Sequence, residues 1–292
     1  MSRPVDLHRL PPGLLVLGAI VSVQTGSAVA RTLFDDLGAA GVTLLRLALS
    51  AVVLLVVLRP GVGAWSARQW QAAGLLGGAM AGMNLVFYLS LRTVPLGVAV
   101  TVEFVGPLLL ALVQTRRAVD LLWALLAASG VVLLGLDTTS GVPVCGLVLA
   151  LVAGLFWAGY ILASARVGSV LPGLDGLAVA LCVAAVLVLP FGADGASAVL
   201  DRPALLLGGL AVAVLSSLVP YGLELTALRR MPTRVFGILM SLEPAAAALA
   251  GLVVLSQTLG AREVVALALV SLASLGVTLG RREGALPAQP LE

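Results

Sequence analysis

The sequence predicts an all-α integral membrane protein with ten transmembrane helices, arranged as two inverted five-helix repeats. Composition, a series of apolar stretches and an internal match lead to this fold class. Apolar residues make up 60% of the 292 residues and charged residues only 11%, whereas about 25% of a soluble domain is charged. Too few polar residues remain to cover a surface in water, so we expect most of the outer face to contact a lipid bilayer.

Ten apolar stretches are long enough to be membrane helices, which need about 20 mostly apolar residues. Short polar or Gly/Pro-rich breaks separate them. The expected spans are 10–30, 37–58, 70–91, 95–114, 121–136, 144–165, 174–191, 203–226, 235–255 and 264–280. Together they account for most of the chain, so we expect no separate soluble domain.

The first span has an alternative interpretation as a cleaved signal peptide. Arg3 and Arg9 precede the apolar run, and Ala28-Val29-Ala30 resembles a signal-peptidase site. The run is, however, long enough to cross a bilayer, which an ordinary signal-peptide core is not. We therefore expect a first transmembrane helix.

Arginine counts predict the orientation, because cytoplasmic loops carry an excess of basic residues. All 17 basic residues are arginines. With the N-terminus inside, twelve flank the cytoplasmic ends: Arg3, Arg9, Arg59, Arg68, Arg116, Arg117, Arg166, Arg229, Arg230, Arg234, Arg281 and Arg282. Four lie outside: Arg31, Arg92, Arg202 and Arg262. We expect a multi-pass protein of a bacterial cytoplasmic (inner) membrane with both termini cytoplasmic.

The chain matches itself across its two halves. Leu91-Arg92 followed by Pro95 recurs as Leu228-Arg229 followed by Pro232. In both halves a second proline follows 12 residues later, at Pro107 and Pro244. The match places the fourth span on the ninth, which divides the chain into repeats at 1–137 and 138–283 and a short cytoplasmic tail at 284–292. Because five spans are an odd number, the second repeat is inverted, a construction typical of secondary transporters.

The residues of this match resemble a known family. The stretch 83–100 is similar to the third and fourth helices of the EamA-type drug/metabolite transporter superfamily, and 41–48 fits as well. Two further groups of residues resemble the threonine and homoserine exporter subfamily. They are Glu103-Phe104 with Gly106-Pro107, and Met231-Pro232-Thr233-Arg234 with Ser241-Leu242-Glu243-Pro244. One departure is Ser256-Gln257-Thr258-Leu259, where the family often has an acidic residue. The resemblance implies ten helices and export of small amino acids.

Four charged residues lie well inside the expected spans: Arg46, Glu103, Glu224 and Glu243. A charge inside a membrane costs at least about 2.5 kcal/mol, so these residues are the first candidates for function. Arg46 has a structural alternative, in which it only ties helices together through Glu103 or Glu224. Ordinary kinks packed against neighbouring helices are the alternative for the prolines that accompany the acids.

Three prolines inside the spans remove backbone hydrogen bonds, because proline has no N–H. Pro107, Pro220 and Pro244 free the carbonyl groups of Glu103, Ser216 and Met240, in that order. Unpaired carbonyls are tolerated at membrane depth where they are buried in protein or line a water-filled cavity. Each proline lies close to one of the acids, Glu103, Glu224 or Glu243. The three prolines and the acids beside them are therefore predicted to line a cavity.

Further polar side chains share helix faces with these groups. Asn84 and Tyr88 are four residues apart on the third span, and Trp157 and Tyr160 are three apart on the sixth. Ser217, Tyr221 and Glu224 are expected on one face of the eighth span, and Gln24 stands alone on the first. We rank Asn84, Tyr221 and Gln24 above Trp157, because aromatic residues in membrane helices are more often anchors.

These residues suit a small zwitterionic substrate, and the resemblance implies threonine, homoserine or a related amino acid. Arg46 is placed to meet the carboxylate, one of the three acids to meet the ammonium, and another to carry an exchanged proton. We expect no metal or other cofactor and no ATP-binding motif, so ion gradients would supply the energy. An exporter of another small metabolite or drug is the alternative within the same superfamily.

Other classes of function fit the sequence less well. A lipid-modifying membrane enzyme would need clustered His, Asp and Ser chemistry, but His8 is the single histidine. A passive pore would not need buried carboxyl groups on opposed repeats. Binding to nucleic acid is not expected, because the net charge is only +3 and the arginines are scattered.

The arginine bias makes the topology testable. A reporter that is active only in the periplasm, fused after Glu292, is expected to be silent. A strong signal from this fusion would overturn the count of ten spans.

Overall fold

The computed structural model describes residues 10–115, 118–135, 142–171, 173–228, 230–231 and 233–280, and within them every regular element is helical. The expectation of an all-α fold is therefore confirmed. Some residues used above lie outside the described part: the tail at 284–292 and Arg3, His8, Arg9, Arg116, Arg117, Arg229, Pro232, Arg281 and Arg282.

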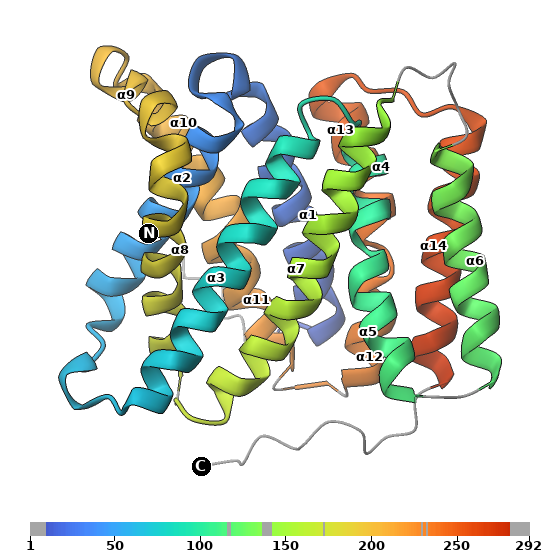
Figure 1. Ribbon diagram of the computed structural model, residues 1–292, viewed down its shortest axis with the longest axis horizontal. Helices are drawn as coiled ribbons and strands as arrows, with labels where there is room; N and C mark the ends of the chain where they lie inside the picture. Colours follow the sequence, from blue (N-terminus) through green and yellow to red (C-terminus); the bar gives the residue numbers. More distant parts are fainter. Residues whose placement is uncertain are drawn as a thin grey trace.

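The helices follow one another along the chain with short connections (Figure 1). The first half contains α1 (Pro12–Thr32), α2 (Phe34–Leu58), the short η2 (Val62–Ala64), α3 (Ala67–Ser90), α4 (Leu96–Glu103), α5 (Val105–Thr115) and α6 (Ala118–Gly135). The second half contains α7 (Val144–Gly168), α8 (Asp175–Ala196), α9 (Ala198–Asp201), α10 (Ala204–Ala213), η3 (Val214–Leu218), α11 (Val219–Leu228), α12 (Thr233–Met240), α13 (Glu243–Leu255) and α14 (Ala261–Gly280).

Nine helical segments of the described chain are long and apolar enough to cross a membrane. Three of them combine consecutive elements, since α4 continues into α5, α10 passes through η3 into α11, and α12 continues into α13. The expected span at 121–136 corresponds to α6, whose apolar part, Leu121–Leu134, is shorter than the other nine. This helix packs along α14 at one edge of the bundle (Figure 1).

The bundle has two ends, which we name after their positions in Figure 1. At the upper end α1 turns into α2, α3 into α4, and α13 into α14; at the lower end α2 leads to α3 and α7 to α8. An ion pair joins Asp36 of α2 to Arg202 of the α9–α10 connection at 2.5 Å, at the upper end. Gln257 also acts there, because its Oε1 accepts the backbone N–H of Leu96, the first residue of α4, at 2.9 Å. Gln257, which lies in the stretch that departs from the family pattern, thus joins the start of α4 to the end of α13.

Two spans are interrupted where the sequence predicted free carbonyl groups. Helix α4 ends at Glu103 and α12 ends at Met240, four residues before Pro107 and Pro244. Around the first interruption the Phe104 N–H donates to the Val100 carbonyl at 2.9 Å, and the Leu108 N–H donates to the Phe104 carbonyl at 3.2 Å. The Glu103 carbonyl has no such partner within α5, because Pro107 lacks the N–H.

The interruption in the fourth span coincides with a close crossing of helices. A Cβ atom at Gly154 of α7 would overlap the carbonyl oxygen of Glu103, and one at Gly106 would overlap the carbonyl of Gly154. Glycine at both positions lets the two backbones touch. The crossing therefore positions Glu103 against α7.

Two glycines of α7 allow a matched test of this crossing. We expect Gly154→Ala to lower the melting temperature of the purified protein clearly, because overpacking a tight contact costs roughly 1–3 kcal/mol. Gly159→Ala, whose Cβ would reach only Ala79 at 4.0 Å, is expected to be neutral. Thermal unfolding in detergent measures both, and equal melting temperatures would contradict the close crossing.

Candidate functional site

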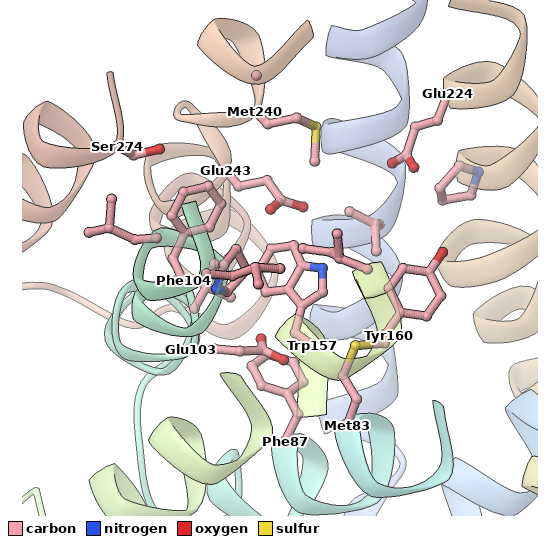
Figure 2. A pocket seen from close by; sticks show the side chains of 18 of the residues that line it. Met83, Phe87, Glu103, Phe104, Trp157, Tyr160, Glu224, Met240, Glu243 and Ser274 are labelled. Carbon is pink, nitrogen blue, oxygen red and sulfur yellow. The ribbon is translucent and has the colours of Figure 1, made fainter. Parts of the chain in front are cut away.

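A cavity of about 560 Å³ lies among the helices and is lined by α1, α2, α3, α7, α11 and α14 together with both interrupted spans. Eight of the nine residues singled out in the sequence line it: Gln24, Arg46, Asn84, Glu103, Tyr160, Tyr221, Glu224 and Glu243. Figure 2 shows the side chains converging on this space from different helices. Residues up to 219 positions apart in the sequence are thus brought to one site.

The cavity occupies the middle and the lower part of the bundle. Its wall reaches downward to Ala111 on α5 and Thr278 on α14. Toward the upper end the helices are packed by the largest cluster of buried apolar side chains, which includes Leu91, Leu96 and Leu147. The cavity is therefore closed at the upper end.

Arg46 enters this wall from α2 and is only 6% exposed. Its Nε donates to the Ser217 hydroxyl at 3.1 Å, its Nη1 to the Tyr88 hydroxyl at 3.2 Å, and its Nη2 to the Ser216 carbonyl at 2.7 Å. The guanidinium also lies 5.6 Å from the centre of the Tyr88 ring. No carboxylate of the described residues forms an ion pair with Arg46, so the alternative link through Glu103 or Glu224 is not what holds it.

The Ser216 carbonyl can accept a hydrogen bond from Arg46 because the local helix geometry leaves it free. Residues Val214–Leu218 form one turn of π-helix directly before Pro220. The Ser216 carbonyl, which Pro220 was expected to free, accepts from Arg46, while the neighbouring Leu215 carbonyl accepts from the Ser22 hydroxyl at 2.7 Å. Side chains of α1 and α2 thus replace the missing backbone donor.

The π-helical turn also shifts the register of the eighth span. Ser217 was expected to share a face with Tyr221, but Ser216 lines the cavity with Tyr221 instead. The widened turn contains one additional residue, so the residue five positions before Tyr221 takes the place of the one four positions before it. Ser217 faces Arg46.

Tyr88 is the one candidate that does not line the cavity. It is fully buried behind Arg46, and its ring packs at 5.7 Å from that of Phe34. Its partner in the sequence pattern, Asn84, does reach the cavity wall, where its amide donates to the Met80 carbonyl at 2.8 Å. Tyr88 therefore acts through Arg46 and has a positioning role.

The three acids come from three different spans. Glu103 ends α4, Glu224 lies in α11, and Glu243 begins α13. Figure 2 shows the carboxyl groups of Glu224 and Glu243 pointing into the same space, and Glu243 is close enough to both other acids to interact with them electrostatically. Glu224 is near the hydroxyl groups of Tyr160 and Tyr221, which are within hydrogen-bonding reach of each other.

Four buried side-chain polar atoms in the described part of the chain have no hydrogen-bond partner. Three of them belong to residues of the cavity wall: Gln24 Oε1, Ser216 Oγ and Glu243 Oε2. Buried polar groups are normally paired, because leaving one unsatisfied costs about 1–3 kcal/mol. Their concentration around one cavity indicates a place for a polar ligand.

Several wall residues were missed or ranked low in the sequence. Trp157 lines the cavity and packs edge-on against Phe104 at 5.3 Å. The missed polar residues are Ser27, Ser164, Ser274 and Thr278. Ser27 is three residues after Gln24, so Gln24 does not stand alone on its helix, and Ser164 is four residues after Tyr160. Helical spacing was therefore a signal that could have found both serines.

The contact between Tyr88 and Arg46 leads to a stability prediction. Tyr88→Phe removes the acceptor of a buried guanidinium N–H, which we expect to cost roughly 1–3 kcal/mol and to lower the melting temperature. Tyr160→Phe is the control, since it removes a hydroxyl that is paired with another neutral hydroxyl. Equal melting temperatures for the two variants would argue against the positioning role.

A model of the EamA-like transporter family matches residues 144–279. The threonine/homoserine exporter RhtA of Salmonella typhimurium (strain SL1344) is 44% identical over 270 residues, which are 90% of this chain and 91% of that protein. RhtA of Escherichia coli (strain K12) is 43% identical over 270 residues, which are likewise 90% of this chain and 91% of that protein. A solved crystal structure with 19% identity and a TM-score of 0.60 covers 92% of this chain and 96% of its own, which shows a similar fold.

Proposed function

Because the chain belongs to the EamA-like transporter family, we propose that it exports small zwitterionic amino acids, of which threonine and homoserine are the first candidates, in exchange for protons. The resemblance found in the sequence is confirmed, and the chain is a multi-pass membrane transporter rather than an enzyme. Two relatives of more than 40% identity that are named as threonine/homoserine exporters support the substrate.

The observation that carries the proposal is the joint presence of one guanidinium and three carboxyl groups in the wall of one cavity. A zwitterion brings both charges into a space of low polarity, where each needs an opposite charge. The planar guanidinium of Arg46 can hold a carboxylate with two parallel hydrogen bonds. One of the three carboxyl groups in the wall of the same cavity can receive the ammonium.

The number of acids supports proton exchange. One carboxyl group meets the ammonium, and the other two remain for protons. A carboxyl group in apolar surroundings can exist in both protonation states near neutral pH, whereas arginine cannot. Glu103 and Glu224 are our candidates for the exchanging group.

We also propose the arrangement of ten transmembrane helices in two inverted repeats, at 1–137 and 138–283. The contacts between helices support this arrangement, because several contacts between two spans recur between the two spans that correspond to them in the other repeat. In a five-plus-five division, the packing of α3 on α7 corresponds to that of α11 on α1, and the packing of α5 on α7 corresponds to that of α13 on α1. Helix α2 also packs on α8, and α6 on α14, and in each of these pairs the two helices occupy equivalent positions in the two repeats.

The orientation with cytoplasmic termini remains our proposal, and the described arginines are consistent with it. Arg59, Arg68 and Arg166 lie at the lower end, whereas Arg31 and Arg202 lie at the upper end. In this orientation the cavity is closed toward the outside, so an exporter would load its substrate from the cytoplasm in the conformation described here.

Transport by purified protein tests the proposal directly. Vesicles containing the protein and loaded with labelled threonine are expected to release it faster when the outside is made acidic, because inward proton flow would drive export. Arg46→Lys is expected to slow release at least tenfold, since the lysine ammonium cannot reproduce the bidentate geometry. Threonine amide, which lacks the carboxylate, should compete poorly in the wild type.

The amount of folded protein is measured beside the flux, because Arg46 also ties helices together. Well-folded Arg46→Lys protein with normal threonine release would exclude the carboxylate role. A rate of threonine release by the wild type that is the same with and without the pH difference would exclude proton exchange.

A further inference from the structure

The unpaired atoms of the cavity wall divide into two groups of opposite character. Gln24 Oε1 can only accept hydrogen bonds, and so can Glu243 Oε2 when the acid is ionised, whereas the Ser216 hydroxyl can also donate. All three side chains are more than nine-tenths buried. The residues that carry these atoms line one cavity from different helices, so the wall has an accepting side and a donating side.

The accepting side is formed by α1 and α13, which pack against each other. The Gln24 side chain lies within hydrogen-bonding reach of the Glu243 carboxyl group. When the Gln24 amide N–H donates to one carboxyl oxygen, Gln24 Oε1 and the other carboxyl oxygen are left as adjacent acceptors. A primary ammonium has three N–H groups and can donate to both.

The donating side is formed by Arg46 and Ser216. Three of the five N–H groups of the guanidinium are used by Ser217, Tyr88 and the Ser216 carbonyl, which leaves one on each terminal nitrogen. The Ser216 hydroxyl adds a further donor. Together they suit a carboxylate.

Helix α1 brings the two sides close together. It carries Gln24, and its Gly26 lies so close to Ser216 that a Cβ atom would overlap the serine hydroxyl. The accepting and donating sides therefore border the same turn of α1. In an α-amino acid the ammonium and the carboxylate are separated by one carbon, so a single molecule can reach both.

Glu103 and Glu224 fit the ammonium less well. Glu103 is within electrostatic range of Arg46, so an ammonium placed there would meet a like charge. Glu224 lies near the hydroxyl groups of Tyr160 and Tyr221, which can donate to it.

We propose that Gln24 and Glu243 form the ammonium subsite and that Arg46 with Ser216 forms the carboxylate subsite, so that an α-amino acid binds in one orientation across α1. This inference rests on the proposed function and adds the orientation of the substrate and a specificity role for Gln24. It also separates Glu243 from the two acids left for proton exchange.

Two competitors of labelled threonine release measure the ammonium subsite. Unlabelled threonine carries both charges, and 3-hydroxybutanoate is the same molecule without the amino group. We expect the wild type to prefer threonine by at least tenfold. In Glu243→Gln and in Gln24→Met the preference is expected to fall below about threefold, because threonine competes less well while 3-hydroxybutanoate competes as before.

Glu224→Gln is the matched control and keeps the preference, whatever its effect on the rate. The preference is a ratio within one variant, so it does not depend on how much protein folds, and Gln24→Met decides the question if Glu243→Gln does not fold. An unchanged preference in Gln24→Met and Glu243→Gln, or a loss confined to Glu224→Gln, would overturn the assignment. Absence of threonine transport in the wild type would instead contradict the proposed function itself.

Discussion

The bonding of Arg46 to the π-helical turn is the constraint on which the cavity depends. A guanidinium at membrane depth is costly unless its N–H groups are paired, and here three neutral acceptors pair them. Two of these acceptors belong to consecutive residues, Ser216 and Ser217, and the carbonyl is available because Pro220 lacks an N–H. The pairing joins α2 to η3 and, through Tyr88, to α3, so it holds the cavity wall while part of the guanidinium stays available.

Proline acts in the same way at the other two places where the backbone is interrupted. At Glu103 and at Met240 a helix ends four residues before a proline, and an acid lies at or near the interruption. Irregular backbone at membrane depth requires protein or water around it. Gly154 satisfies this requirement at Glu103 by bringing α7 into backbone contact. The costly features of the chain are therefore collected around one cavity, where they can serve a polar substrate.

Most membrane spans and most of the candidate site could be predicted from the sequence, because a bilayer makes both conspicuous. An apolar run of sufficient length has few alternatives to a membrane helix, and a charged residue within it is rarely without a role. Eight of nine candidate residues line the cavity for this reason. The fifth expected span corresponds to α6, although its apolar part, Leu121–Leu134, is shorter than the other spans.

The sequence by itself determined where helices would be interrupted and which side chains would be costly, since both follow from the chemistry of single residues and their near neighbours. Only the tertiary structure decided what those groups contact. The π-helical turn places Ser216, rather than Ser217, in the cavity wall. Tyr88 lies behind Arg46, and Arg46 donates hydrogen bonds to neutral groups rather than to an acid. Arg46 contacts Ser216 and Ser217 about 170 residues away in the chain and Tyr88 42 residues away. Helical spacing carries no information over such distances.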